Sequence, residues 1–207
     1  MVASGALDGL DVELVDGLLV DRHSHRADPI HRLDVGTFGR MVASGALEGK
    51  RVELLEGLLV EVSPQSEEHA EAIRRLIRHL TSAAADAWLD VQLPLEADSG
   101  SLPEPDLALV ERQHPANRHP RSALLVIEVA VSSHMKDRHT KANMYAWVPV
   151  PTYWLVDVPG EAVEVRTDPG PDGYRHCEIY TAGMSVPSPH LGVADLDVGA
   201  LFGGIDD

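Results

Sequence analysis

One apolar run constrains the fold of this chain more than any other feature. Residues 123 to 131 read ALLVIEVAV, and only Glu128 interrupts the apolar pattern. A strand with one face in solvent alternates between apolar and polar residues, whereas this run is apolar at successive positions. It therefore predicts a strand that is covered on both faces, within a sheet that has helices on both sides.

The remaining periodicity is that of an α/β domain. A helical stripe follows Ser66, which has the place of an N-cap before Glu67 and Glu68, and we expect this helix to run to about Ala87. A second helix is expected at 137–147, where two prolines end it. Apolar runs predict strands at 91–95, 106–110 and 153–158, then a hairpin over 161–181 and a packed C-terminal segment at 194–202.

The chain begins with a near-duplicate. Residues 1–20 read MVASGALDGLDVELVDGLLV and residues 41–60 read MVASGALEGKRVELLEGLLV, so fifteen of twenty positions are identical. Each copy has two apolar runs around Asp16-Gly17 or Glu56-Gly57, which predicts a tight hairpin. A capped helix follows the second copy and a linker follows the first. The period therefore stops, and the chain is not a solenoid.

The first copy is expected to be an appendage. Residues 21–36 are polar and without period, which is typical of a linker, and Thr37 then has the place of an N-cap before a short helix. We expect a duplicated hairpin-like segment and linker at 1–36 and one domain at 37–207. Because its apolar strands must be buried, the first copy should extend the sheet beside its twin or pack across a homodimer interface.

Composition limits the classes of function. The chain has 33 acidic residues against 17 Lys and Arg, a formal charge of −16, which argues against a general binder of nucleic-acid backbones. Cys177 is the only cysteine, which agrees with a reducing, cytoplasmic location. No run approaches the roughly 18 apolar residues of a membrane helix, and the sequence starts without the pattern of a secretory signal. We expect no membrane association.

Two carboxylates have the places of metal ligands. Glu128 lies in the middle of an apolar strand, where a carboxylate is unfavourable unless a cation, a metal or a hydrogen-bond donor compensates it. Asp106 follows Pro103-Glu104-Pro105 and opens a second buried strand. Carboxylates at the ends of neighbouring strands can share one hard divalent cation, completed by a backbone carbonyl such as that of Val129 and by waters.

A lysine is expected beside these carboxylates. Asp137, Lys141 and Tyr145 recur at four-residue spacing, so they share one face of the second helix, and this face can point back at Glu128. A lysine beside a metal can orient or deprotonate a water, or stabilise charge that develops on a phosphoryl oxygen. The set is typical of metal-assisted hydrolysis.

Each residue of this set also has an ordinary structural explanation. The PEPD stretch can simply end a loop, a structural Lys or Arg can neutralise Glu128, and Asp137 with Lys141 can form an exposed ion pair on the helix. The combination of the residues and their order along the chain favours a metal site.

The same stretches resemble a known family. PEPDLALV, LLVIEVAVSS, the spacing of Asp137, Lys141 and Tyr145, and PTYWLVDV together resemble the Uma family of putative bacterial endonucleases, a branch of the PD-(D/E)XK restriction-endonuclease-like superfamily. VELLEGLLVEVSPQSEEHA resembles the hairpin and first helix of that family. The resemblance covers about residues 37–202. It implies a central mixed sheet flanked by helices, Mg²⁺ or Mn²⁺, and phosphodiester hydrolysis.

The resemblance also implies roles for single residues. Asp106 and Glu128 resemble the two metal-binding carboxylates, with the Val129 carbonyl as a further ligand. The usual lysine position holds Ala130, and Lys141 resembles the lysine of the branch in which it has moved to the following helix. His69 matches a position where the family commonly shows histidine and related nucleases place an acid, and Glu68 is its alternative. Asp137 and Tyr145 are possible supporting residues.

The function expected is that of a magnesium-dependent endonuclease that hydrolyses phosphodiester bonds, with DNA as the substrate that the resemblance implies. The alternative is an acidic interaction or regulatory module that keeps the fold but does not cleave. The retained carboxylates and lysine favour the enzyme, whereas the charge and the absence of a basic run favour the module. A metal-dependent phosphoesterase that acts on RNA or small phosphoesters is a third possibility.

Overall fold

The computed structural model describes residues 5–15, 18–22, 30–62, 64–81, 87–112, 118–131, 135–188 and 193–203, and at 135–139 it describes the backbone alone. The chain forms two compact units, one of residues 1–63 with 96–103 and one of residues 64–95 with 104–207. Each unit has its own hydrophobic cluster. None of the helices within these ranges combines the length and the apolar character that crossing a bilayer requires.

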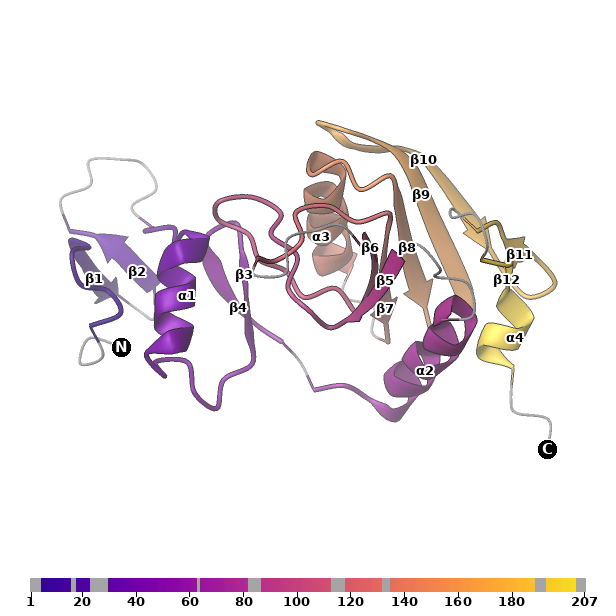
Figure 1. Cartoon of the computed structure of the whole chain (residues 1–207), viewed down its shortest axis with the longest axis horizontal. Helices are drawn as coiled ribbons and strands as arrows, with labels where there is room; N and C mark the ends of the chain where they lie inside the picture. Colours follow the sequence, from indigo (N-terminus) through magenta and orange to yellow (C-terminus); the bar gives the residue numbers. More distant parts are fainter. Residues whose placement is uncertain are drawn as a thin grey trace. The chain divides into compact units, whose positions relative to one another are not determined.

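The second unit is built on a six-stranded mixed sheet (Figure 1). The strands are β5 (Ala87–Val91), β6 (Leu107–Glu111), β7 (Leu125–Ala130), β8 (Thr152–Asp157), β9 (Ala162–Gly170) and β10 (Gly173–Tyr180). Their order across the sheet is β10-β9-β8-β7-β6-β5. β7 and β8 are parallel, and the other neighbours are antiparallel. A parallel pair needs a crossover, which helix α3 (Met135–Trp147) supplies.

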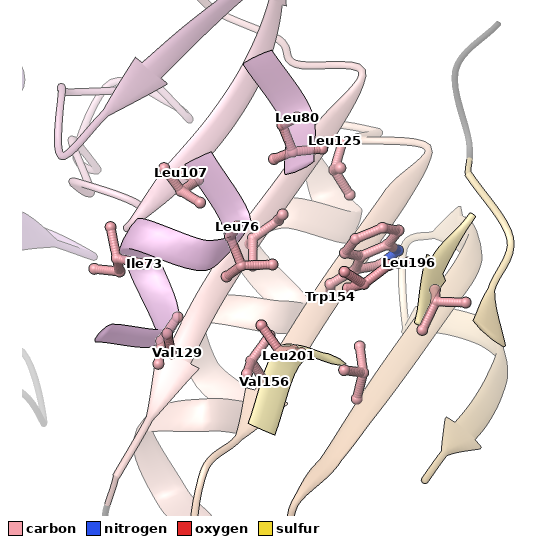
Figure 2. Packing of buried hydrophobic residues seen from close by; sticks show 14 of the residues in the cluster. Ile73, Leu76, Leu80, Leu107, Leu125, Val129, Trp154, Val156, Leu196 and Leu201 are labelled. Carbon is pink, nitrogen blue, oxygen red and sulfur yellow. The ribbon is translucent and has the colours of Figure 1, made fainter. Parts of the chain in front are cut away.

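Strand β7 is covered on both faces, as its apolar run predicts. Leu125, Val126 and Ile127 each expose 0% of their surface. Leu125 and Ile127 belong to the cluster that helix α2 (Glu67–Thr81) covers (Figure 2). Glu128 is one position out of phase with them, so it lies on the opposite face, where it contacts α3. The two helices therefore cover opposite faces of the sheet.

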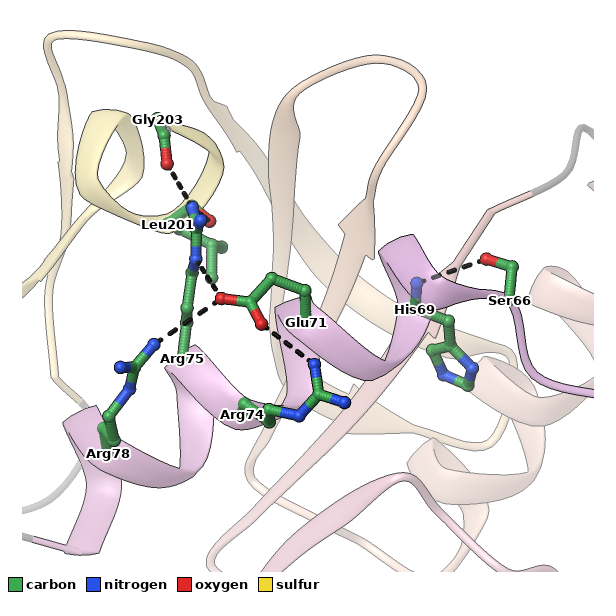
Figure 3. Close-up of polar contacts among 8 residues, drawn as sticks. All are labelled: Ser66, His69, Glu71, Arg74, Arg75, Arg78, Leu201 and Gly203. Carbon is green, nitrogen blue, oxygen red and sulfur yellow. Dashed lines mark hydrogen bonds and ion pairs between the residues drawn. The ribbon is translucent and has the colours of Figure 1, made fainter. Parts of the chain in front are cut away.

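Helix α2 begins as the sequence predicts. The Ser66 hydroxyl accepts a hydrogen bond from the backbone N–H of His69 at 3.3 Å, which satisfies one of the N–H groups at the helix start. On the outer face, Glu71 forms ion pairs with three arginines of the same helix, Arg74, Arg75 and Arg78 (Figure 3).

Three short elements complete the cluster of the second unit near the C-terminal end of the described residues. Strands β11 (Ser185–Val186) and β12 (Leu196–Asp197) pair, and helix α4 (Val198–Phe202) follows. Arg75 joins α2 to α4 by donating to the carbonyl oxygens of Leu201 and Gly203 (Figure 3). The C-terminal segment thus packs back, as expected.

The region between α2 and β6 differs from the sequence prediction. Helix α2 ends at Thr81, not near Ala87, and Trp88 lies in β5 with 43% of its surface exposed. Pairing with β6 overrides the helical spacing of this stretch. The strand expected at 91–95 is therefore wrong in position. It ends at Val91, because Gln92 takes a positive φ of 50° and leaves the extended conformation.

In its described residues the first unit has two hairpins and one helix (Figure 1). β1 (Val12–Val15) pairs with β2 (Leu18–Asp21), and β3 (Val52–Leu55) pairs with β4 (Leu58–Glu61). Helix α1 (Val35–Ala43) lies between the two hairpins in the sequence. Its residues Phe38 and Met41 belong to the hydrophobic cluster of this unit. Its N-cap is Asp34, whose carboxylate accepts from the N–H of Thr37, so the cap predicted at Thr37 is wrong by three positions.

The predicted turn at Glu56-Gly57 is confirmed. Both residues have positive φ, 50° and 79°, as a type I′ hairpin turn requires. Residue 57 must also be glycine because Arg32 is packed against it. A Cβ at this position would be 2.5 Å from the Cβ of Arg32. The turn at Asp16-Gly17 lies outside the described residues.

The hairpin of the first copy does not extend the sheet of its twin. Within the described residues, β1–β2 and β3–β4 are separate two-stranded sheets. The first of the two fates expected for the copy is therefore wrong. The domain boundary at residues 36 and 37 stays a prediction.

Candidate active site

The two candidate carboxylates lie at one end of the β6–β7 ladder. The register of this antiparallel pair runs from Leu109 opposite Leu125 to Leu107 opposite Ile127. Continued by one step beyond β6, the same register would set Asp106 across from Glu128. Asp106 exposes 8% of its surface, and the side chain of Glu128 exposes 13%. The two carboxylates thus belong to neighbouring strands at the same end of the ladder, where Asp106 accepts from the N–H of the residue that follows Glu128.

Asp106 is held by the backbone of β7 and by α2. Its Oδ2 atom accepts from the N–H of Val129 at 2.8 Å and lies 3.0 Å from Nε2 of His69. In the continued register Val129 would face Pro105, so the Asp106 carboxylate takes the place of the next ladder bond. The N–H and C=O of one strand residue point to the same edge, so the carbonyl of Val129 also faces the side of Asp106.

Gln92 is a site residue that the sequence prediction missed. Its backbone N–H donates to the carbonyl of Asp106 at 3.2 Å, and its Nε2 lies 3.4 Å from Asp106 Oδ1. The pairing of Val91 with Leu107 brings Gln92 next to Asp106. A strand prediction that ended at residue 91 would have found this neighbour, but the strand was expected to begin there.

Glu128 is held by α3. Its Oε1 atom accepts from the hydroxyl of Tyr145 at 2.9 Å and lies 3.2 Å from Nζ of Lys141. The side chain of Lys141 exposes 19%, so this ion pair is largely removed from solvent. The helical face expected from the four-residue spacing thus points at Glu128. The side chain of Asp137, the third residue of that spacing, lies outside the described part of the chain.

The two acid-or-histidine candidates of α2 separate clearly. His69 is 9% exposed and its ring reaches Asp106. Glu68 is exposed, and a hydrogen bond from Ser66 lowers the pKa of its carboxyl. Figure 3 shows the His69 ring apart from the Glu71 arginine cluster. Glu68 therefore contacts the helix start, and of the two candidates His69 is the one whose side chain reaches Asp106.

A buried aromatic group lies beside Glu128. The ring of Tyr153 is 5.7 Å from that of Tyr145 and 6.0 Å from that of Tyr174, between centroids. Burial, and then the charge of Glu128, raise the pKa of Tyr153. Among the described residues, the Tyr153 hydroxyl has no hydrogen-bond partner. Tyr145 and Tyr153 are both 0% exposed, so their rings shield this side of Glu128 from bulk solvent, which strengthens its interaction with Lys141.

The donor chemistry fits a hard divalent cation. Two carboxylates and a backbone carbonyl are ligands that Mg²⁺ and Mn²⁺ prefer, with waters to complete the coordination. The described residues nevertheless contain no group of three or more His, Cys, Asp or Glu arranged to hold a metal. Here Asp106 contacts His69, whereas the Lys141 ammonium lies on Glu128. The residues therefore have the donor atoms that such a cation prefers, but they are not arranged as a preformed metal site.

Comparison with known proteins agrees with this fold. A crystal structure described as a putative nuclease from Anabaena variabilis superposes with a TM-score of 0.62 at 16% identity, covering 73% of this chain and 89% of that one. At this identity the likeness shows the fold, and it confirms the predicted α/β sheet with flanking helices. A comparison with curated protein sequences gives no match.

The family is shown by sequence. The model of the Uma2 family, described as putative restriction endonucleases, matches residues 37–199. The chain belongs to this family, as the resemblance of its motifs indicated.

Proposed function

We propose that this protein is a metal-dependent endonuclease that hydrolyses phosphodiester bonds, with DNA as substrate. The observation that carries the proposal is the hydrogen bond from the Val129 N–H to Asp106, which ties Asp106 to the residue next to Glu128, together with Lys141 3.2 Å from Glu128. Membership of a family of putative restriction endonucleases supports it.

In this proposal the carboxylates bind the metal and the lysine acts on the attacking water or on the developing charge. Asp106, Glu128 and the Val129 carbonyl would hold Mg²⁺ or Mn²⁺, which supplies Lewis-acid polarisation of the phosphodiester and a more acidic water. Lys141 positions the attacking water or stabilises the charge that develops on a phosphoryl oxygen. Its ammonium is kept near the reacting atoms by Glu128.

The surrounding residues fix the two carboxylates. His69 and the N–H of Val129 contact Oδ2 of Asp106, and Gln92 contacts Oδ1. Tyr145 holds Glu128 from α3. Ligands that are already oriented lose less entropy when the cation and substrate bind, so these contacts favour a productive geometry.

A second candidate is a catalytically silent acidic module on the same fold. The ion pair of Lys141 with Glu128 favours it, because the lysine neutralises the buried carboxylate without a metal. The formal charge of −16 also opposes binding to a polyanion. In the endonuclease proposal, local divalent cations must offset this repulsion at the site.

A nuclease assay separates the two candidates. Supercoiled DNA, linear duplex DNA, single-stranded DNA, RNA and a small aryl phosphodiester are incubated with the protein and Mg²⁺ or Mn²⁺, or with EDTA. We expect cation-dependent cleavage of DNA, and a loss of about a hundredfold or more in Asp106→Asn and Glu128→Gln. Asp168→Asn, which removes an exposed carboxylate paired with Arg175, is the matched control and should keep full activity.

Each other outcome is informative. Cleavage of RNA or of the small diester alone would replace DNA as the substrate. No cleavage by the folded wild type with either cation would favour the silent module. A cytoplasmic location and a homodimer are also part of the proposal, the first because Cys177 is the only cysteine.

A further inference from the structure

The two copies of the duplicated segment fold alike. In both hairpins the register is the same, with Leu14 opposite Leu19 and Leu54 opposite Leu59. The preceding turns also match, since the N–H of Asp8 donates to the carbonyl of Gly5 at 3.1 Å and the equivalent bond in the second copy is 3.0 Å. Any difference between the hairpins therefore comes from what covers them.

The second copy is covered by a strand-like segment of the same chain. The N–H of Leu102 donates to the carbonyl of Leu54 at 2.7 Å, and the two residues form an antiparallel bridge. The N–H of Gly57 donates to the carbonyl of Gly100 at 2.7 Å. Leu54 is 0% exposed and Leu102 6% exposed. Residues 100–102 thus pair with the outer edge of β3 as a strand would, although the segment is too short to count as one.

Among the described residues, no strand pairs with the equivalent edge of β1. Leu14, the counterpart of Leu54, exposes 62% of its surface, and its neighbours Val15 and Leu18 expose 44% and 46%. Because Leu14 has the register position of Leu54, its N–H and C=O point away from β2. Within the described residues, the structure pairs β1 with β2 alone. A bare apolar edge of this kind is a template for pairing with another strand.

We propose that the outer edge of β1 binds a second copy of this chain, with β1 paired antiparallel to β1 of the second copy about a two-fold axis. The twin hairpin shows that this sequence accepts a strand at this edge. Among the described residues, the first unit has two hairpins and one covering segment, Gly100–Leu102, and that segment lies on β3, so the proposed strand for β1 is that of another molecule. The inference is independent of the proposed catalytic function.

The sequence of β1 suits pairing with itself. A two-fold axis at Leu14 brings Leu14 opposite its own counterpart and Glu13 opposite Val15, so no like charges meet directly. Isologous pairing closes after two chains and buries both bare edges at once. Each chain carries a formal charge of −16, so the repulsion between them must be screened, and salt should strengthen the dimer.

Disulfide trapping tests the register. Leu14→Cys is made in a Cys177→Ser background, because Cys177 is exposed. Two cysteines in a hydrogen-bonded antiparallel pair have Cα atoms about 5.5 Å apart, within the range of a disulfide. We expect a cross-linked dimer on mild oxidation. Val42→Cys in the same background is the matched control, since Val42 is 57% exposed on α1, and it should stay uncross-linked.

Sedimentation tests the association itself. The wild type should dimerise with an affinity that rises with NaCl. Leu14→Glu should weaken dimerisation about tenfold or more, because like charges then meet directly across the axis. Ile179→Glu, at a residue 61% exposed in β10, should leave the association unchanged. A wild type that stays monomeric, equal cross-linking at positions 14 and 42, or a dimer that Leu14→Glu does not weaken would each overturn the proposal.

Discussion

The carboxylate of Asp106 accepts a hydrogen bond at 2.8 Å from the backbone N–H of Val129, the residue that follows Glu128. This bond replaces the next rung of the β6–β7 ladder, so it ties the position of Asp106 to the strand that carries Glu128. The two carboxylates are therefore positioned by one piece of backbone, while α2 and α3 hold their side chains from opposite faces of the sheet.

Gln92 offers a test that separates backbone from side chain. Its φ of 50° is unfavourable for a residue with a Cβ, so Gln92→Gly should be more stable than Gln92→Ala by about 1 kcal/mol in urea denaturation. Both variants lose the amide next to Asp106, so both should lower cleavage to the same extent. Wild-type activity in both would show that the side chain does not act on Asp106, and recovery in Gln92→Gly alone would assign the effect to backbone strain.

Tyr145 should act through Glu128. Tyr145→Phe removes the hydroxyl that donates to Glu128 but keeps the buried ring, so we expect a loss of about 0.5–1.5 kcal/mol in stability together with a lower kcat and weaker Mn²⁺ binding. Tyr174→Phe is the matched control, because it removes a hydroxyl that donates to the Val150 carbonyl. It should lose similar stability and keep kcat. Equal kcat in both variants would count against a positioning role.

Helix α1 should show an acid-dependent stability through its N-cap. The hydrogen bond from the Thr37 backbone lowers the pKa of Asp34 below its ordinary value of 3.8. A lowered pKa means that the contribution is complete above that value and is lost as the pH falls through the folded pKa. Asp34→Ala should therefore destabilise the protein by about 1 kcal/mol at neutral pH, and by less in acid. Asp34→Asn keeps the cap without the charge, so an unchanged acid dependence in this variant would contradict the assignment.

Removing residues 1–36 should leave the candidate site intact. The described hydrogen bonds and ion pairs of Asp106 and Glu128 come from residues 69 to 145, so the shortened chain should keep the Mn²⁺ affinity of the full chain. The first unit should lose stability, because Leu33 is 4% exposed and its N–H donates to Gly57 at 2.8 Å. A Mn²⁺ titration checks the first statement, and thermal unfolding followed by circular dichroism checks the second. A shorter deletion of residues 1–22 removes the first hairpin alone, and collapse of the sheet in either variant would show that the copy is integral.

The sequence was sufficient where one residue pattern had one structural solution. Successive apolar positions in β7 required cover on both faces, and four-residue spacing on α3 was enough to bring Lys141 and Tyr145 to Glu128. It failed where pairing decided the outcome. The helical spacing up to Trp88 predicted a helix, but this stretch pairs with β6 as strand β5. Because the strand was therefore predicted in the wrong place, Gln92 was not recognised as a neighbour of Asp106.

The duplicated segment shows a limit of a different kind. Leu14 and Leu54 have nearly the same sequence around them and the same register, yet one is 62% exposed and the other 0%. The difference comes from Leu102, which is distant in sequence. No local pattern could have separated the two copies, because burial here depends on a tertiary neighbour.

Divalent-cation binding tests the central claim most directly. Mn²⁺ is titrated into the wild type, Asp106→Asn, Glu128→Gln and the control Asp168→Asn, with the free ion followed by electron paramagnetic resonance. The account predicts binding to the wild type and to Asp168→Asn, and its loss in the two site variants while their circular dichroism spectra are unchanged. Absence of Mn²⁺ and Mg²⁺ binding to the folded wild type, or binding that survives both site substitutions, would contradict it.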